Sequence, residues 1–289
     1  MLMFGFGYTA SFLQKKLKDL GFDVIGTSRH QDNIDDHDTR RQKGSYELIL
    51  FDAVHHTKHL DTVTHVLISA PPVAMLGDPV LHAYHELLKK HAHHIQWLGY
   101  LSSTGVYGDH QGKWVDESSP SVSPGTQGRL RRDAEKAWVS FAKTCDLPLH
   151  IFRLAGIYGP QRNALSRLKR GKKQTIYKKD QFFSRIHVED IAAIIIASVQ
   201  KIHPFSIYNV SDDEPAPSHV VDDYAASLMH RPPLERVPFL KATLSPMGKD
   251  FYTHNRRVSN AKIKQELCIK LKYPTYKEGL KKIHDNGDY

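Results

Sequence analysis

The stretch LMFGFGYTASFLQKKLKDLGFDVIGTS, residues 2–28, decides the fold. It opens with a short apolar run at 2–4 and continues through the glycine-containing turn GFGYTA. Apolar side chains then recur at the spacing of one helical face, as far as Gly21, which ends the helix. DVIGTS at 23–28 is a second strand-like run. The stretch therefore predicts a strand, a tight turn, a helix and a second strand.

The same alternation of strand-like and helical segments continues along the chain. Further strand-like runs are ELILF (47–51), HVLISA (65–70), IQWLGYLSS (95–103), LHIFRLAGI (149–157) and SIYNV (206–210), and helical patterns cover 79–93, 127–144 and 188–200. This rhythm predicts the α/β class, with a doubly wound parallel sheet of the Rossmann type. We expect residues 1–160, completed by about 186–212, to form this domain. Residues 161–185 and 213–289 would form a smaller, α-rich substrate lobe.

Gly5, Gly7 and Ala10 match the pattern GxGxxA between the first strand and the first helix. In dinucleotide-binding sites the first glycine allows the tight turn, and the second lets the backbone approach the pyrophosphate. The third small residue lets the helix pack closely on the strand, and the N–H groups of the helix N-terminus bind the phosphates. The predicted cofactor-binding residues are Gly5, Phe6, Gly7, Tyr8, Thr9, Ala10, Ser28, Arg29, Asp52, Ser69, Ala70, Pro71 and Ser102.

The end of the second strand bears on the choice between NADP and NAD. NAD sites usually place Asp or Glu there, to bind the ribose hydroxyls. Here the strand ends in Ser28 and Arg29, and the nearest carboxylates, Asp32, Asp35 and Asp36, come later in a loop. A guanidinium can bind the 2′-phosphate of NADP through charge-assisted hydrogen bonds. We therefore predict NADP as the cofactor, with NAD as the second choice.

Four later motifs follow one another in an order that resembles a known family. They are YLSSTGVYGD (100–109), FRLAGIYGP (152–160), RIHVEDIA (185–192) and YNVSDDEP (208–215). With the glycine turn, they resemble the extended short-chain dehydrogenases/reductases, the nucleotide-sugar epimerase/dehydratase group, over nearly the whole chain. The resemblance implies an NAD(P)-dependent oxidoreductase or epimerase-like enzyme. Its substrate would be a small anionic molecule, with nucleotide-sugars among the candidates.

The resemblance also implies catalytic residues, and the chain departs from one of them. In the family, a Ser or Thr four residues before the VYG tyrosine binds the substrate oxygen, and Ser103 holds that position. The family's acid/base is the tyrosine of a YxxxK motif on a later helix, and the lysine lowers its pKa. Counting from Ser103 places Gly128 at the tyrosine position and Arg132 at the lysine position. The chain thus resembles an atypical branch that lacks this tyrosine.

We predict Ser103 and Tyr107 as the catalytic residues, with Tyr107 replacing the missing proton donor. The predicted substrate-binding residues are Thr104, Arg162, Arg185 and His187. An arginine can bind a phosphate or a carboxylate through two parallel hydrogen bonds, and an exposed basic surface is the alternative reading. The alternative function is a non-catalytic NADP-binding regulatory protein, in which the bound cofactor controls a partner.

The net charge of +9 suits an anionic ligand and, taken alone, would equally suit nucleic acid. The basic segment 162–185 matches no nucleic-acid-binding module, so we expect solvated surface there and do not favour a nucleic-acid partner. The nineteen histidines show no converging ligand set, and we predict no metal site.

Cys145 and Cys268 lie far apart, which fits a reducing cytoplasm. No apolar run reaches the length of a membrane span, and the N-terminal sequence has no signal-peptide pattern. We therefore expect a cytoplasmic protein without a membrane partner.

Overall fold

The computed structural model describes residues 1–30, 46–56 and 60–289, which form two compact units. Unit 1 contains Met1–Ser103, Arg129–Arg153 and Ile191–Tyr208, and unit 2 contains Thr104–Gly128, Leu154–Asp190 and Asn209–Tyr289. Residues 104–128, which the sequence assigned to the dinucleotide domain, are thus part of unit 2. Asp32, Asp35 and Asp36 lie outside the described residues.

Unit 1 is built on a sheet that has seven strands within the described ranges, in the order β11-β7-β5-β4-β1-β2-β3. The strands are β1 (Leu2–Phe4), β2 (Ile25–Ser28), β3 (Glu47–Leu50), β4 (His65–Ile68), β5 (Trp97–Ser103), β7 (Leu149–Leu154) and β11 (Ser206–Val210). The pairings of β1 with β2 and β4, of β2 with β3 and of β4 with β5 are parallel. The chain moves outward from β1 in both directions, so the predicted doubly wound fold is confirmed.

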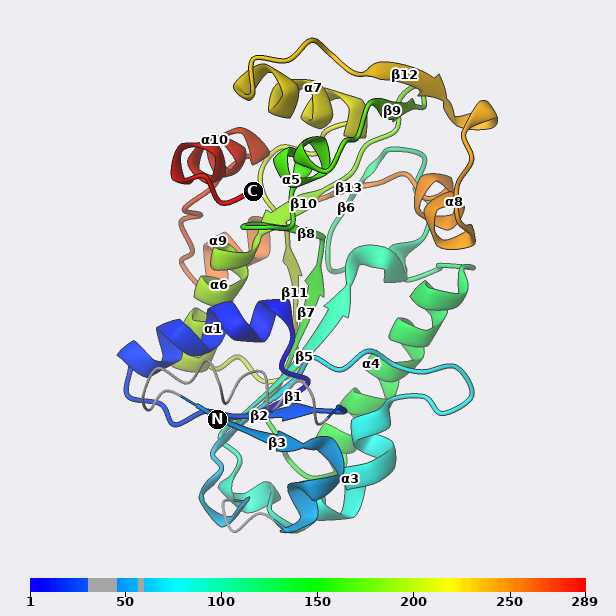
Figure 1. Cartoon of the computed structure of the whole chain (residues 1–289). Coiled ribbons are helices and arrows are strands. Elements are labelled where there is room, and N and C mark those ends of the chain that lie inside the picture. Colours follow the sequence, from blue (N-terminus) through cyan, green and yellow to red (C-terminus); the bar gives the residue numbers. More distant parts are fainter. Residues whose placement is uncertain (31–45, 57–59) are drawn as a thin grey trace. The chain divides into compact units, whose positions relative to one another are not determined.

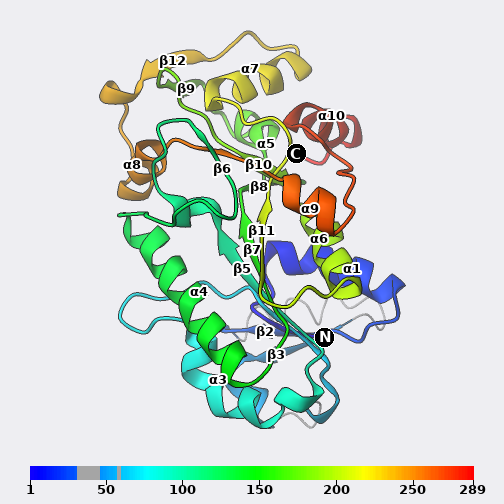
Figure 2. The ribbon, with the colours of Figure 1, turned by 180° about the vertical axis from the view of Figure 1, so that it is seen from behind.

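Helices cover both faces of this sheet (Figures 1 and 2). They are α1 (Tyr8–Asp19), α3 (Pro79–Lys90), α4 (Thr126–Thr144) and α6 (Val188–Gln200), with short 3₁₀ turns η1 (Phe51–His56), η2 (Leu60–Thr62) and η3 (Ala92–His94). The helices α3 and α4 share one face, where Tyr84 and Trp138 pack in one buried cluster with Phe4 and Tyr100 of the sheet. The helices α1 and α6 lie on the other face.

One predicted strand divides into two. The run at 149–157 forms β7, which ends at Leu154, and then β8 (Gly156–Tyr158), which pairs with β10 (Arg185–His187) in a different sheet. Between them, the Ala155 N–H donates to the carbonyl of Val210, and the Gly156 N–H donates to the carbonyl of Ser184. The single-strand prediction was therefore wrong at its C-terminal end, because the backbone changes partner at this point.

Unit 2 consists of short helices and three two-stranded parallel sheets within the described part of the chain, β8 with β10, β9 with β12 and β6 with β13. Its elements beyond β8 and β10 are η4 (Thr104–Tyr107), β6 (Trp114–Val115), α5 (Ala164–Lys169), β9 (Gln174–Tyr177), α7 (Ser218–Leu228), β12 (Glu235–Pro238), η5 (Phe239–Lys241), α8 (Pro246–Thr253), β13 (Arg257–Val258), α9 (Ala261–Glu266) and α10 (Tyr276–Asn286). The core joins α5, α7 and α10 through Leu165, Ala225 and Leu280. The basic segment 162–185 is thus partly built into this core. No described helix combines the length and apolar character needed to cross a membrane.

Candidate functional site

The glycine turn between β1 and α1 closes against the end of β4. Gly5 has φ +92°, and a Cβ on it would lie 3.0 Å from the Ala70 nitrogen. Its N–H donates to Thr27 Oγ1 at 3.0 Å, and Ser69 Oγ donates to its carbonyl at 2.5 Å. Only glycine combines this left-handed conformation with this close approach. The structure therefore brings the predicted residues Gly5, Ser69 and Ala70 together.

The start of α1 leaves room for a phosphate. Gly7 is the N-cap of α1, and no side chain caps the helix there. A Cβ added to Gly7 would meet no atom within 4 Å, so the backbone is open to an approaching ligand. Ala10 is buried and lets the first turn pack closely. Uncapped N–H groups at a helix N-terminus attract anions, so the local geometry fits a dinucleotide pyrophosphate.

The remaining predicted cofactor residues of unit 1 lie around this turn or at neighbouring strand ends. Tyr8 and Thr9 are in the first turn of α1, Phe6 stacks on Tyr46, and Pro71 follows Ser69 and Ala70 after β4. Ser28 ends β2, where its hydroxyl is hydrogen-bonded to the backbone of His30. Arg29 and Asp52 are exposed after β2 and β3. Their contacts with a cofactor stay predictions.

The end of β5 is fixed by a buried charged network from α4. Ser102 Oγ donates to Glu135 Oε1 at 2.5 Å, so its hydroxyl already has a protein partner. Arg153 binds the same carboxylate twice, from Nε to Oε1 at 3.1 Å and from Nη2 to Oε2 at 2.8 Å. One turn earlier on α4, Arg131 donates to the carbonyl of Leu101 at 2.7 Å. This network holds the backbone just before Ser103, the last residue of β5.

The loop residues after β5 are buried in unit 2. Thr104 and Tyr107 lie in η4, and the Tyr107 side chain is fully enclosed. Its hydroxyl donates to Asn209 Oδ1 at 2.7 Å. Gly128 is also enclosed, since a Cβ there would lie 2.6 Å from the carbonyl oxygen of Gly105. The proposed catalytic role of Tyr107 stays a prediction, and its hydroxyl would have to leave Asn209 to fulfil it.

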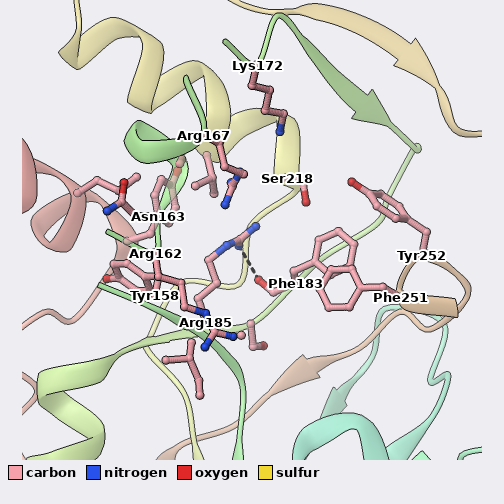
Figure 3. Close-up of a pocket in the computed structure, with 17 residues that line it drawn as sticks. Tyr158, Arg162, Asn163, Arg167, Lys172, Phe183, Arg185, Ser218, Phe251 and Tyr252 are labelled. Carbon is pink, nitrogen blue, oxygen red and sulfur yellow. Dashed lines mark hydrogen bonds between the residues drawn. The ribbon is translucent and has the colours of Figure 1, made fainter. Parts of the chain in front are cut away.

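Unit 2 contains a pocket of about 350 Å³, which is within the size range of small-molecule sites. Four cationic side chains line it, namely Arg162, Arg167, Lys172 and Arg185. Figure 3 shows the Arg185 guanidinium at the centre, between Arg167 and the aromatic wall. That wall includes Phe183 and Phe251, whose rings stack at 4.5 Å, together with Tyr252. We call this the cationic pocket.

Arg185 is the cation that most needs a ligand. Its Nη1 donates to the carbonyls of Phe183 and Ala216, each at 2.8 Å, which fixes the guanidinium in place. Burial lowers its pKa, and the like charge of Arg167 lowers it further, although Asp212 partly opposes both. Within the described part of the chain, no carboxylate oxygen comes within 4.0 Å of this guanidinium. A half-buried cation without an ion pair is only partly solvated, so an anion here would be favoured.

The structure thus brings together two of the four predicted substrate residues, Arg162 and Arg185. His187 does not line the pocket, because it is buried between the rings of Tyr158 and Tyr273. Thr104 is likewise absent from the pocket lining. The sequence did not single out Arg167, Lys172, Phe251 and Tyr252, which also line this pocket. The high positive charge of the 162–185 segment was the available signal, but the partners in α7 and α8 are distant in sequence.

Comparison with solved structures shows similarity over nearly the whole chain. A functionally unknown conserved protein from Silicibacter pomeroyi DSS is 44% identical, with a TM-score of 0.91, and the match covers 100% of this chain and 99% of that one. A dTDP-glucose 4,6-dehydratase from Bacillus anthracis in complex with NAD is 19% identical, with a TM-score of 0.80 and coverage of 98% and 94%. A UDP-glucuronic acid 4-epimerase from Bacillus cereus in complex with NAD is 16% identical, with a TM-score of 0.75 and coverage of 98% and 97%. The last two similarities show the fold.

Sequence comparisons identify the family of the chain. Protein YeeZ of Escherichia coli K12 is 30% identical over 227 residues, which covers 74% of this chain and 77% of YeeZ. The model of the NAD dependent epimerase/dehydratase family matches residues 1–211. This range includes the glycine turn, β5 and the first part of unit 2. The chain therefore belongs to the NAD dependent epimerase/dehydratase family.

Proposed function

We propose that this protein is a dinucleotide-dependent, epimerase/dehydratase-like oxidoreductase whose small anionic substrate binds in the cationic pocket. The observation that carries the proposal is the convergence of Arg167 and Arg185 on one pocket, with Arg185 lacking an ion pair among the described residues. Nucleotide-sugars are among the candidate substrates, since two structural relatives are named as enzymes of dTDP-glucose and UDP-glucuronic acid.

The proposed binding of the cofactor depends on residues of unit 1. The open backbone at Gly7 and the uncapped N-terminus of α1 would hold the pyrophosphate. Arg29, exposed directly after β2, would bind the 2′-phosphate, which favours NADP over NAD. When bound, the cofactor would supply the hydride transfer that the side chains of a protein cannot perform.

The proposed binding of the substrate depends on the positive charge of the cationic pocket. Arg185 would bind a phosphate or carboxylate oxygen with the guanidinium N–H groups that face the pocket, and Arg162 lies at its rim. The stacked pair Phe183 and Phe251 offers an apolar wall to the rest of the molecule. Charge-assisted hydrogen bonds are about twice as strong as neutral ones, so the anionic group would supply much of the binding energy.

The proton-transfer step has no YxxxK tyrosine at the position counted from Ser103. We propose that Ser103, at the end of the rigidly held strand β5, binds the reacting oxygen. The proton would come from another group, for which Tyr107 is the sequence candidate and a water molecule the alternative.

The test is a substrate screen followed by one substitution. NADPH absorbance is monitored with a panel of phosphorylated aldehydes and ketones and of nucleotide-linked keto-sugars. For a compound that is reduced, Arg185→Met should raise KM by at least about tenfold, because a charge-assisted contact contributes about 1.5–3 kcal/mol. Arg170→Met is the matched control, since Arg170 is exposed at the end of α5 and does not line the pocket.

An unchanged KM in Arg185→Met would place the substrate's charged group outside the pocket. If the protein binds NADP but reduces none of the compounds, the alternative of a non-catalytic NADP-binding regulator gains support. Binding of neither NADP nor NAD would contradict the cofactor half of the proposal.

A further inference from the structure

Asp222 does not line the cationic pocket, but its negative charge offsets part of the positive charge of the lining. Asp222 of α7 is completely enclosed and lies behind two of the four cations. Its Oδ1 accepts from Arg167 Nη2 at 3.1 Å, and its Oδ2 accepts from Lys172 Nζ at 2.6 Å. A third donor, Thr175 Oγ1, reaches the same Oδ2 at 2.6 Å. The carboxylate therefore holds both cations at one wall.

Asp222 stays ionised under ordinary conditions. Burial works to raise its pKa, but Lys172, Thr175 and Arg167 outweigh this and hold the pKa below its usual value. Asp212 differs from it, because burial raises the pKa of Asp212 well above the usual value, although the charge of Arg185 partly opposes this. The pocket is thus lined by four cations, and the ionised Asp222 pairs with two of them from behind, so a positive surplus remains for the ligand.

We propose that Asp222 is a specificity-determining residue, which tunes the cationic pocket to a dianionic phosphate group rather than to a more highly charged one. The inference rests on the proposed function of the pocket as the substrate's anion site. Asp222 has two effects that follow from its contacts. It orients Arg167 and Lys172, and it cancels part of their field at the ligand. The second effect grows with the charge of the ligand, because Coulomb energy is proportional to that charge.

The test uses two inorganic probes that differ in charge, phosphate and pyrophosphate, titrated calorimetrically into the full-length protein at one mildly alkaline pH. Asp222→Asn keeps the size of the side chain and removes its charge. The ratio of pyrophosphate affinity to phosphate affinity should rise at least about tenfold, because one additional ligand charge within about 12 Å of Asp222 contributes roughly 1.4 kcal/mol or more at an effective dielectric constant of about 20. A ratio measured on one protein sample does not depend on the fraction that is folded.

Asp223→Asn is the matched control. Asp223 is the next residue of α7, and its carboxylate pairs with Arg236, which is outside the pocket lining. The same charge is removed, but solvent and salt screen it, so the ratio should change by less than about twofold. An Asp222→Asn protein that still binds phosphate with an unchanged or lower ratio would overturn the inference.

A second pair of variants covers the case in which Asp222→Asn does not fold. Lys172→Met should lower the ratio, and Lys172→Met combined with Asp222→Asn should bring it back toward the wild-type value. If the double variant keeps the ratio of Lys172→Met, Asp222 has no role in charge selection. Failure of the pocket itself gives a different result, because the wild-type protein would then bind neither probe, or Arg185→Met would bind both unchanged.

Discussion

Gly128 packs directly against Ser123, and the contact leaves no room for a side chain. A Cβ on Gly128 would lie 2.5 Å from Ser123 Cβ and 2.6 Å from the carbonyl oxygen of Gly105. The serine hydroxyl could rotate away, but the carbonyl is part of the backbone of η4 and cannot. Gly128, which occupies the position of the family's tyrosine when residues are counted from Ser103, thus has no room for a larger side chain. Installing a tyrosine at 128 would disturb unit 2 before it could restore proton transfer.

Gly128→Ala should therefore destabilise the protein by about 1–3 kcal/mol, the usual cost of overpacking a filled site. The helical preference of alanine over glycine would offset part of this cost. Urea unfolding followed by circular dichroism measures the change. Gly7→Ala is the control, since a Cβ there meets no atom and only the preference for glycine over alanine at an N-cap is lost, an expected change of about 1 kcal/mol or less. Equal stability of the two variants would show that the η4 backbone can shift to accommodate the methyl group at position 128.

Gly7→Val should abolish dinucleotide binding and leave the fold intact. The Cβ of the added side chain meets no protein atom within 4 Å, but the side chain would occupy the region where the pyrophosphate approaches the start of α1. Titration with NADP and NAD, together with the melting temperature, measures the two effects separately. Unaltered affinity with an unaltered melting temperature would mean that the phosphates bind elsewhere.

Arg29→Ala should weaken NADP binding by about 1.5–3 kcal/mol and leave NAD binding nearly unchanged. The reason is that the 2′-phosphate, which only NADP carries, would lose its charge-assisted hydrogen bonds. Calorimetric titration of both cofactors into wild type and variant gives the comparison. Lys18→Ala removes another exposed cation of unit 1 and serves as the control. Equal NADP and NAD affinities in the wild-type protein would contradict the prediction.

The contrast between Gly7 and Asp222 shows what the sequence could predict. Gly5, Gly7 and Ala10 lie in one short segment, so the steric requirement at each position can be inferred from the local sequence. The strand, turn and helix form as predicted. Asp222 and Lys172 meet across 50 residues, and no local pattern records that contact. The division of the 149–157 run was hidden for a similar reason, since the partners of Ala155 and Gly156 come from distant segments.

The stability of the protein should fall between pH 6.5 and about 4 partly through His65. Burial lowers the pKa of this side chain from 6.5 to about 4, and the N-terminal ammonium group contributes to the shift. A base with a depressed folded-state pKa is protonated first in the unfolded chain. Its contribution to stability is therefore complete above pH 6.5, declines as the pH falls and levels off below about 4.

The expected loss from His65 is at most about 3 kcal/mol, the linkage value of a pKa shift from 6.5 to about 4 at a buried side chain. Unfolding free energies of wild type and His65→Gln are measured across this range. The variant should lose less stability on acidification, whereas His82→Gln, at an exposed position of α3, should follow the wild type. Parallel curves for all three proteins would exclude His65 as a source of acid sensitivity.

Substitution of Ser103 should lower mainly kcat, whereas substitution of Tyr107 should lower mainly stability. Ser103 ends β5, where Arg131 donates to the Leu101 carbonyl and Glu135 accepts from the Ser102 hydroxyl, so Ser103→Ala should remove a fixed hydrogen bond to the reacting oxygen. Loss of such a donor lowers kcat by ~10²–10³. The Tyr107 hydroxyl is enclosed and donates to Asn209, so Tyr107→Phe should lose about 1 kcal/mol of stability and retain most of the turnover. A fall in kcat of ~10²–10⁴ at unchanged stability would instead identify Tyr107 as the proton donor, released from Asn209 when substrate binds.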